Sequence, residues 1–290
     1  MTAPTTNLET APQLAAIRPA AAQPRRQSGM WSTFALHWPE YLIEASALAA
    51  FMVSACGFTI LLEHPSSPVR QAMGSAELRR VLMGVAMGLT AIVIIYSPFG
   101  KRSGAHMNPA VTLAFFRLGK IKAVDAAFYA LAQVVGGIMG VALVWALEPK
   151  AIQHPAVNYA VTTPGQLGVG AALLAEFAMS FILMTAILAA IGSPHTECFS
   201  GLIAGGLVAS YISIEAPLSG MSINPARTIA SALWPWTWTG FWIYAVAPPM
   251  GMLAAAELML LLRRGRTPHC AKLHHRNSQR CIFCGTQGGI

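Results

Sequence analysis

Ser103-Gly-Ala-His-Met-Asn-Pro-Ala-Val-Thr112 and Ser219-Gly-Met-Ser-Ile-Asn-Pro-Ala-Arg-Thr228 are two versions of one ten-residue segment, identical at six positions without a gap. A glutamate precedes each copy, Glu44 in Leu-Ile-Glu-Ala and Glu176 in Ala-Glu-Phe-Ala. Repetition of motifs in the same order is the signature of a duplicated fold. The chain is therefore expected to contain two related halves, one over about residues 38–150 and one over about 165–264.

The composition places both halves in a membrane. Of the 290 residues, 55% are hydrophobic and only 10% are charged, whereas soluble proteins carry about 25% charged residues. Six apolar stretches are long enough to cross the hydrocarbon core, which takes about 20 helical residues. They run approximately over Tyr41–Leu62, Val81–Phe99, Val124–Leu147, Leu167–Ile191, Phe199–Ile214 and Gly240–Leu262. Because three spans per half is an odd number, the second half would run inverted relative to the first.

The positive charges predict the orientation. The formal net charge is +8, and Lys and Arg cluster in both tails and in the loop 101–122. With these segments on one side, 14 cations lie there against four (positions 70, 79, 80 and 150) on the other. The positive-inside rule then makes both termini cytoplasmic. A nucleic-acid face would instead set the cations among aromatic residues along one surface, so nucleic acid is not an expected partner.

The first 37 residues are expected to form a disordered cytoplasmic tail. They are rich in Ala, Pro, Thr and Gln, too polar to pack, and residues 1–30 lack the apolar core of a signal peptide. The first membrane span would therefore act as the insertion signal.

Asn108-Pro109-Ala110 and Asn224-Pro225-Ala226 each stand at the head of a short apolar segment, residues 109–117 and 225–234. Proline suits the first turn of a helix and asparagine caps it. Both segments are too short to span, so each is predicted to be a re-entrant half-helix. Inverted symmetry would bring the two N-termini together near the midplane, each with about half a positive charge. Such a pair would repel cations, orient an oxygen-bearing permeant toward the asparagine donors and prevent proton relay.

The fold class predicted is thus an all-α membrane protein with six transmembrane helices and two re-entrant half-helices in an inverted duplicated repeat. Its predicted function is a passive transmembrane channel. A coupled secondary transporter, which inverted repeats also allow, would need a titratable or ion-binding group at the midplane, where the paired turns offer only amides. No enzyme activity is expected, because the spans contain no nucleophile–base constellation.

Over about residues 40–262 the sequence resembles the major intrinsic proteins, the aquaporins and aquaglyceroporins, as a bacterial-type member. The resemblance rests on the two motifs, on Arg227 after the second, on both glutamates and on Gln133 in the third span. It implies an inner-membrane homotetramer with one pore per subunit and no required cofactor. Arg227 would be the cation of the outer constriction. Glu44 and Glu176 would be buried acceptors of loop hydrogen bonds, with His106 supporting the loop and Gln133 packing beside it.

The family pattern also implies a selectivity filter. It would consist of Met87, Ile212, Met221 and Arg227, although an ungapped count gives Gly88 in place of Met87. The water-selective pattern has an aromatic residue and a histidine at the first two places, so this filter would be wider and more apolar. The residues around the second motif follow neither the water-channel pattern nor the glycerol-channel pattern throughout. Together with the filter residues, they are nearest to the plant nodulin-like branch of the family. We expect water to pass, with glycerol, another neutral polyol or a metalloid hydroxide as the alternative main solute.

Residues 265–290 form a basic tail rich in cysteine and histidine, which the family does not generally carry. Cys281 and Cys284 have the spacing that lets two thiolates reach one zinc ion. Cys270 and a histidine, His274 in our assignment, would complete four ligands. Two other interpretations stay open: a redox thiol pair, and a solvated basic tail lying on an anionic leaflet.

Overall fold

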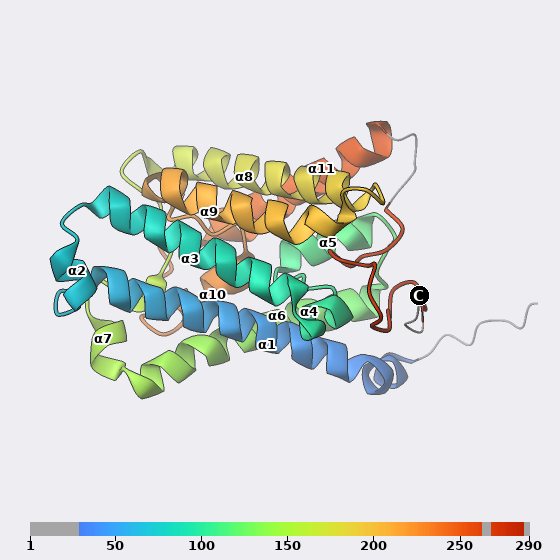
Figure 1. The fold of residues 1–290 in the computed structure, drawn as a ribbon, viewed down its shortest axis with the longest axis horizontal. Coiled ribbons are helices and arrows are strands. Elements are labelled where there is room, and N and C mark those ends of the chain that lie inside the picture. Colours follow the sequence, from blue (N-terminus) through green and yellow to red (C-terminus); the bar gives the residue numbers. More distant parts are fainter. Residues whose placement is uncertain (1–28, 263–267, 287–290) are drawn as a thin grey trace, which may run out of the picture.

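The computed structural model describes residues 29–262 and 268–286, which form helices joined by loops. Within this described part six helical segments are long and apolar enough to cross a membrane, which confirms the predicted fold class. They are α1 (Met30–Glu63), α3 (Ala76–Tyr96), α6 (Ala123–Leu147), α8 (Gly168–Ile191), α9 (Ser200–Ser219, preceded by η2, Glu197–Phe199) and α11 (Phe241–Leu262). Two half-helices, α5 (Pro109–Arg117) and α10 (Pro225–Ala232), lie among them (Figure 1). Short elements connect the spans: α2 (Pro68–Ala72), α4 (Pro98–Ser103), α7 (Pro149–Gln153) and η1 (Asn158–Ala160).

Helix α1 begins at Met30, earlier than the span predicted from Tyr41. Its first turns are held by α6: the His37 ring and the Tyr41 hydroxyl each bond Asp125 Oδ1 at 2.7 Å, and Tyr41 stacks on Phe128. These long-range contacts are invisible in local hydropathy, so the predicted tail boundary at residue 37 falls too late. Residues 1–28 of that tail lie outside the described residues.

The two halves are built alike and pack against each other. In the first half α1 packs along α6, and in the second α8 packs along α11, while α3 and α9 pack together across the halves. Each half-helix crosses over, since α5 packs on α11 and α10 packs on α6. In Figure 1 the start of α1 and the C-terminal tail lie at one end of the bundle, and α2 and α7 lie at the other.

The contact between α3 and α9 depends on glycines. A Cβ on Gly88 would lie 2.5 Å from the Gly205 carbonyl oxygen, and one on Gly205 would lie 2.5 Å from the Gly88 carbonyl oxygen. Small residues let helix backbones approach closely in a membrane, where packing drives association. This crossing sets how closely the two halves approach each other.

We therefore expect Gly88→Ala to destabilise the protein by about 2 kcal/mol, because an overpacked helix contact must move apart. The matched control is Gly206→Ala, on the same helix pair, where a Cβ meets nothing within 4 Å. The measurement is the thermal unfolding midpoint of the detergent-solubilised protein. Equal midpoints for the two variants would contradict the close crossing.

Candidate functional site

The two Asn-Pro-Ala loops share an unusual backbone conformation. Positive φ angles occur at equivalent places in both: 105° and 77° at Gly104 and Gly220, 55° and 49° at Ala105 and Met221, and 50° and 49° at Met107 and Ile223. Non-glycine residues seldom adopt this region. Such strain persists only where the surroundings hold it in place. The repeat therefore extends from sequence identity to backbone geometry.

Glu44 holds the first loop. Its fully buried carboxylate accepts hydrogen bonds from Ser103 Oγ (2.7 Å), from the backbone N–H of His106 (3.1 Å) and from that of Met107 (2.7 Å). Gln133 Nε2 donates to the same carboxylate at 2.9 Å. Gln133 thus does more than pack, since it fixes the orientation of the glutamate.

Glu176 holds the second loop in the same way. Its carboxylate, also fully buried, accepts from Ser219 Oγ (2.7 Å) and from the backbone N–H groups of Ser222 (2.7 Å) and Ile223 (2.6 Å). A buried charge is tolerated when its lone pairs are satisfied by donors. Each glutamate is placed to supply what the strained loop needs, which is an acceptor for its inward-facing N–H groups.

Two tyrosines and two threonines in this support were missed by the sequence reasoning. The Tyr129 hydroxyl donates to the Ser103 carbonyl at 2.7 Å, and the Tyr244 hydroxyl donates to the Ser219 carbonyl. Thr112 bonds the His106 ring and Thr228 bonds the Ser222 hydroxyl. The sequence does contain a signal for the tyrosines, because each one follows the serine of its motif by nearly the same interval (26 and 25 positions).

The two asparagines connect the loops to each other. Asn108 Nδ2 donates to the Ile223 carbonyl at 2.7 Å, and Asn224 Nδ2 donates to the Met107 carbonyl at 2.7 Å. Their Oδ1 atoms cap the half-helices by accepting from Ala110 N (2.9 Å) and Ala226 N (3.0 Å). Each amide nitrogen has two N–H donors, and one of them is used in this cross-pairing. Both side chains line the central cavity, so the second donor is available to a molecule inside it.

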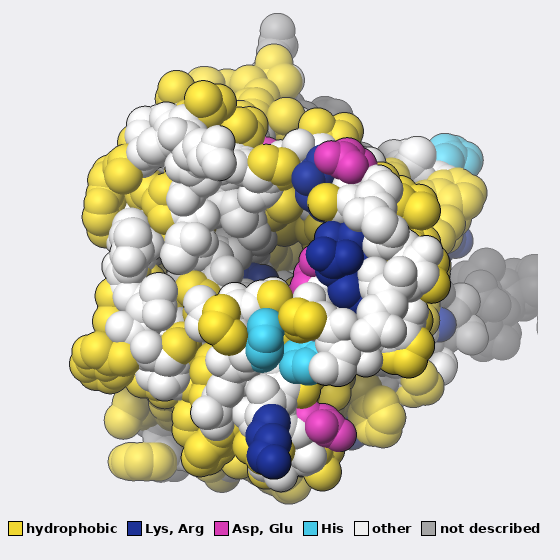
Figure 2. Space-filling model, turned by 90° about the vertical axis from the view of Figure 1, so that its left-hand side faces the viewer, with side chains coloured by type: hydrophobic (Ala, Val, Ile, Leu, Met, Phe, Trp, Pro, Cys, Tyr) yellow, Lys and Arg dark blue, Asp and Glu magenta, His cyan; other side chains and the backbone are white. Residues whose placement is uncertain are grey.

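The cavity encloses about 480 Å³ and runs along the bundle between the two halves. At one end it is lined by Glu63 and Arg80, near α2. Figure 2 views that end of the molecule and shows a hollow near its centre, with charged side chains beside it. At the other end it is lined by Ile95 and by Leu273 of the C-terminal tail. The paired asparagines lie between these ends, so the cavity has the layout of a pore.

All four predicted filter residues line this cavity: Met87, Ile212, Met221 and Arg227. Gly88, the alternative to Met87, packs against α9 instead. Arg227 extends from the first turn of α10, and its buried Nη1 has no hydrogen-bond partner among the described residues. An arginine at this depth needs a polar or water-filled cavity. Its unpaired donor can therefore meet a permeant.

The tail brings three cysteines and one histidine together. The ligand atoms of Cys270, His275, Cys281 and Cys284 all lie within 4.8 Å of one another. The predicted ligand set named His274, but the structure places His275 in this cluster, and the His274 ring packs against Tyr96 with centroids 5.4 Å apart. Hydrogen bonds from Cys270 and from His275 hold the pKa of Cys281 well below its usual value.

These features define a class of protein: a membrane channel with two half-helices that meet at their N-termini inside a pore. The Major intrinsic protein family model matches residues 31–259. Aquaporin-4 of Mus musculus is 32% identical over 79% of this chain and 68% of its own length. A probable NIP-type aquaporin of Nicotiana alata is 34% identical over 73% and 76%. The fold is shared with the X-ray structure of the aquaglyceroporin from Plasmodium falciparum (TM-score 0.64, 18% identity, 77% and 95% of the two chains).

The chain belongs to the major intrinsic protein family, whose members are channels and not enzymes. It is therefore a multi-pass membrane channel for water and small uncharged solutes, and its family needs no cofactor.

Proposed function

We propose that water and small uncharged solutes cross this pore passively, in contact with the second amide donors of Asn108 and Asn224. The observation that carries the proposal is the reciprocal pairing of the two loops, in which Asn108 donates to the Ile223 carbonyl and Asn224 donates to the Met107 carbonyl beside the cavity. The two amide donors and the two positive half-helix ends orient the oxygen of a passing molecule. A water oxygen held in this way accepts two hydrogen bonds and cannot accept a proton from its neighbour. The same positive ends repel cations.

The filter of the proposed channel consists of Met87, Ile212, Met221 and Arg227. Three of these side chains are apolar, and Arg227 is the charged donor among the four. Selectivity therefore depends mainly on the width of the pore at the filter. Pore diameter and the lining donors together set which neutral molecules pass. Methionine is flexible and adapts to what lies beside it. We infer that the constriction admits molecules larger than water, of which glycerol is the first to test, and NIP-type relatives from plants are among the similar proteins.

The expected result is rapid water flux together with measurable glycerol flux in liposomes. Combining Met87→Phe with Ile212→His adds bulk and a donor to the filter. This double variant should lower glycerol flux by roughly tenfold or more and retain water flux. The measurement is stopped-flow light scattering with water, glycerol and urea gradients on the same liposomes.

The control for that experiment is Ile214→His, two positions along α9, where the side chain is 77% exposed. It should leave the ratio of glycerol to water flux unchanged. If the double variant and the wild type gave the same ratio, the assigned filter would be wrong.

We further propose that the channel is a homotetramer of the inner cell membrane with both termini in the cytoplasm. Support for the orientation comes from the cation bias and from the start of α1 and the C-terminal tail lying at the same end of the bundle (Figure 1). The homotetramer is the usual assembly of this family. Large apolar side chains such as Leu89, Val93 and Leu131 lie exposed on the spans, available to lipid or neighbouring subunits.

A further inference from the structure

The C-terminal tail docks directly on the first pore loop. The His106 ring donates from Nε2 to the Ala271 carbonyl at 2.7 Å, and Leu273 N donates to the Gly104 carbonyl at 3.2 Å. The Phe283 ring lies over His106, with centroids 5.7 Å apart and an interplanar angle of 3°. Through these contacts the tail reaches the loop that carries Asn108. The Leu273 side chain itself lines the pore cavity.

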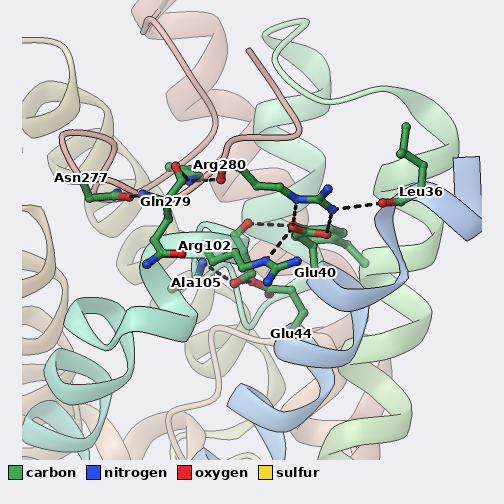
Figure 3. Close-up of polar contacts among 11 residues, drawn as sticks. Leu36, Glu40, Glu44, Arg102, Ala105, Asn277, Gln279 and Arg280 are labelled. Carbon is green, nitrogen blue, oxygen red and sulfur yellow. Dashed lines mark hydrogen bonds and ion pairs between the residues drawn. The ribbon is translucent and has the colours of Figure 1, made fainter. Parts of the chain in front are cut away.

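One side of the tail is anchored to α1 by an ion pair between the partly exposed Arg280 and the buried Glu40. Arg280 donates from Nε (2.8 Å) and Nη2 (2.7 Å) to the Glu40 carboxylate, which is fully buried. Arg102 from α4 donates to the same carboxylate at 2.9 Å, and Arg280 also donates to the Leu36 carbonyl (Figure 3). Bidentate arginine–carboxylate pairs are among the stronger polar contacts.

The other side of the tail is anchored to the segment before α9. Glu197 accepts hydrogen bonds from the backbone N–H groups of His275 (2.7 Å) and Arg276 (2.9 Å). Ser200 donates to the Leu273 carbonyl. The tail therefore bridges from α1 and α4 in the first half to α9 in the second. At the end of the pore, the Leu273 backbone donates to Gly104 of the first loop and accepts from Ser200 of α9.

The Cys/His cluster joins the tail segment around Leu273 to the tail segment around Phe283. Cys270 and His275 flank Leu273 in the sequence, and Cys281 and Cys284 flank Phe283. The Cys270 and Cys281 sulfurs lie 3.2 Å apart, and His275 Nε2 lies 3.1 Å from the Cys284 sulfur. Around zinc, with Zn–S bonds of about 2.3 Å in a tetrahedron, two sulfurs would lie about 3.8 Å apart. A small outward shift would thus admit the ion.

The chemistry of the cluster favours zinc among biological metals. Three thiolates and one imidazole are a common structural zinc set, and soft sulfur ligands discriminate against magnesium and calcium. Such a site carries a net charge of minus one, and the buried Lys272 interacts electrostatically with all three cysteines. The described part of the tail contains no helix or strand. A short segment of this kind gains its order from the metal.

We propose that Cys270, His275, Cys281 and Cys284 bind one zinc ion, and that the ion holds residues 268–286 across the pore mouth with Leu273 facing the cavity. The tail lies beyond residues 31–259, the part matched by the family model. Zinc would thus close or narrow this pore from an element that is additional to the channel. Metal binding stands independently of the proposed function, and only the flux effect rests on it.

The first test is the zinc content of the purified full-length protein, dialysed with zinc and measured by inductively coupled plasma mass spectrometry. The wild type should retain about one zinc per chain. His275→Ala and Cys284→Ser should lose it, whereas His274→Ala, which changes the adjacent histidine outside the cluster, should keep it. Equal zinc content in His274→Ala and His275→Ala would overturn the site. So would a Cys270–Cys281 disulfide in the purified protein.

The second test is osmotic water flux of liposomes containing the full-length protein, with zinc or with a zinc chelator on both sides. The wild type should conduct several-fold faster in chelator, and His275→Ala should conduct at the fast rate in both conditions. A zinc-loaded wild type that conducts as fast as the chelated protein would overturn the closure. Failure of the channel itself would appear differently, as no flux above empty liposomes in chelator.

Discussion

Replacing Asn224 with aspartate should reduce water flux to that of empty liposomes. Asn224 Nδ2 lies 2.7 Å from the Met107 carbonyl and donates to it. An aspartate would set a carboxylate oxygen against that carbonyl, and two acceptors repel. The variant would also remove the donor that faces the permeant. Losing a buried hydrogen bond and leaving its partner unsatisfied costs about 1–3 kcal/mol, so the paired loops should separate.

The control for this substitution is Asn158→Asp, which makes the same chemical change at an exposed asparagine. It should conduct like the wild type. Both variants are compared by stopped-flow light scattering in the presence of a zinc chelator, at equal protein content in the liposomes. Wild-type water flux in Asn224→Asp would show that the reciprocal asparagine contact is not needed for conduction.

Replacing Glu176 with glutamine should have the largest effect on stability. The carboxylate accepts three hydrogen bonds, with Oε1 bonded to Ser219 and Ser222 and Oε2 bonded to Ile223. In glutamine one of these oxygens becomes an NH₂ group, which would face a donor. Hydrogen bonds to charged groups contribute about 1.5–3 kcal/mol each. We expect a loss of about 3 kcal/mol, a lower unfolding midpoint and little remaining flux.

Glu257→Gln is the matched control, because the Glu257 side chain on α11 is half exposed and pairs with the half-exposed Arg117. Exposed pairs contribute about 0–1 kcal/mol, so this variant should unfold near the wild-type midpoint. The measurement is thermal unfolding in detergent followed by liposome flux. If Glu176→Gln were as stable as Glu257→Gln, the glutamate would not hold the loop.

The parts of the fold that repeat were readable from the sequence. These parts are the motif copies, the glutamates and the six apolar runs, which are local patterns in the sequence. Because the chain is duplicated, each pattern in one half supports the same pattern in the other half. The structure shows the same repetition in the bonds of Glu44 and Glu176. The choice between Met87 and Gly88 was open, because it depends on which residue of α3 faces α9. In the structure Gly88 takes that place.

What the sequence could not supply are contacts between distant segments. Arg280 and Glu40 are 240 positions apart, and no local pattern connects them. The start of α1 depends in the same way on Asp125. Sequence spacing also could not choose between His274 and His275 as the histidine of the cluster, because both are close enough in sequence to the cysteines. Only the direction of each ring decides which one lies beside them. The docking of the tail on His106 was therefore absent from the prediction.

A pore built on the paired asparagine turns should conduct water and exclude protons. Both fluxes can be measured in the same liposomes, with zinc chelated and a pH-sensitive dye inside. We expect water flux far above that of empty liposomes and proton flux equal to that of empty liposomes. Water flux no faster than in empty liposomes, or proton flux that rises together with water flux, would show that the paired turns do not form such a pore.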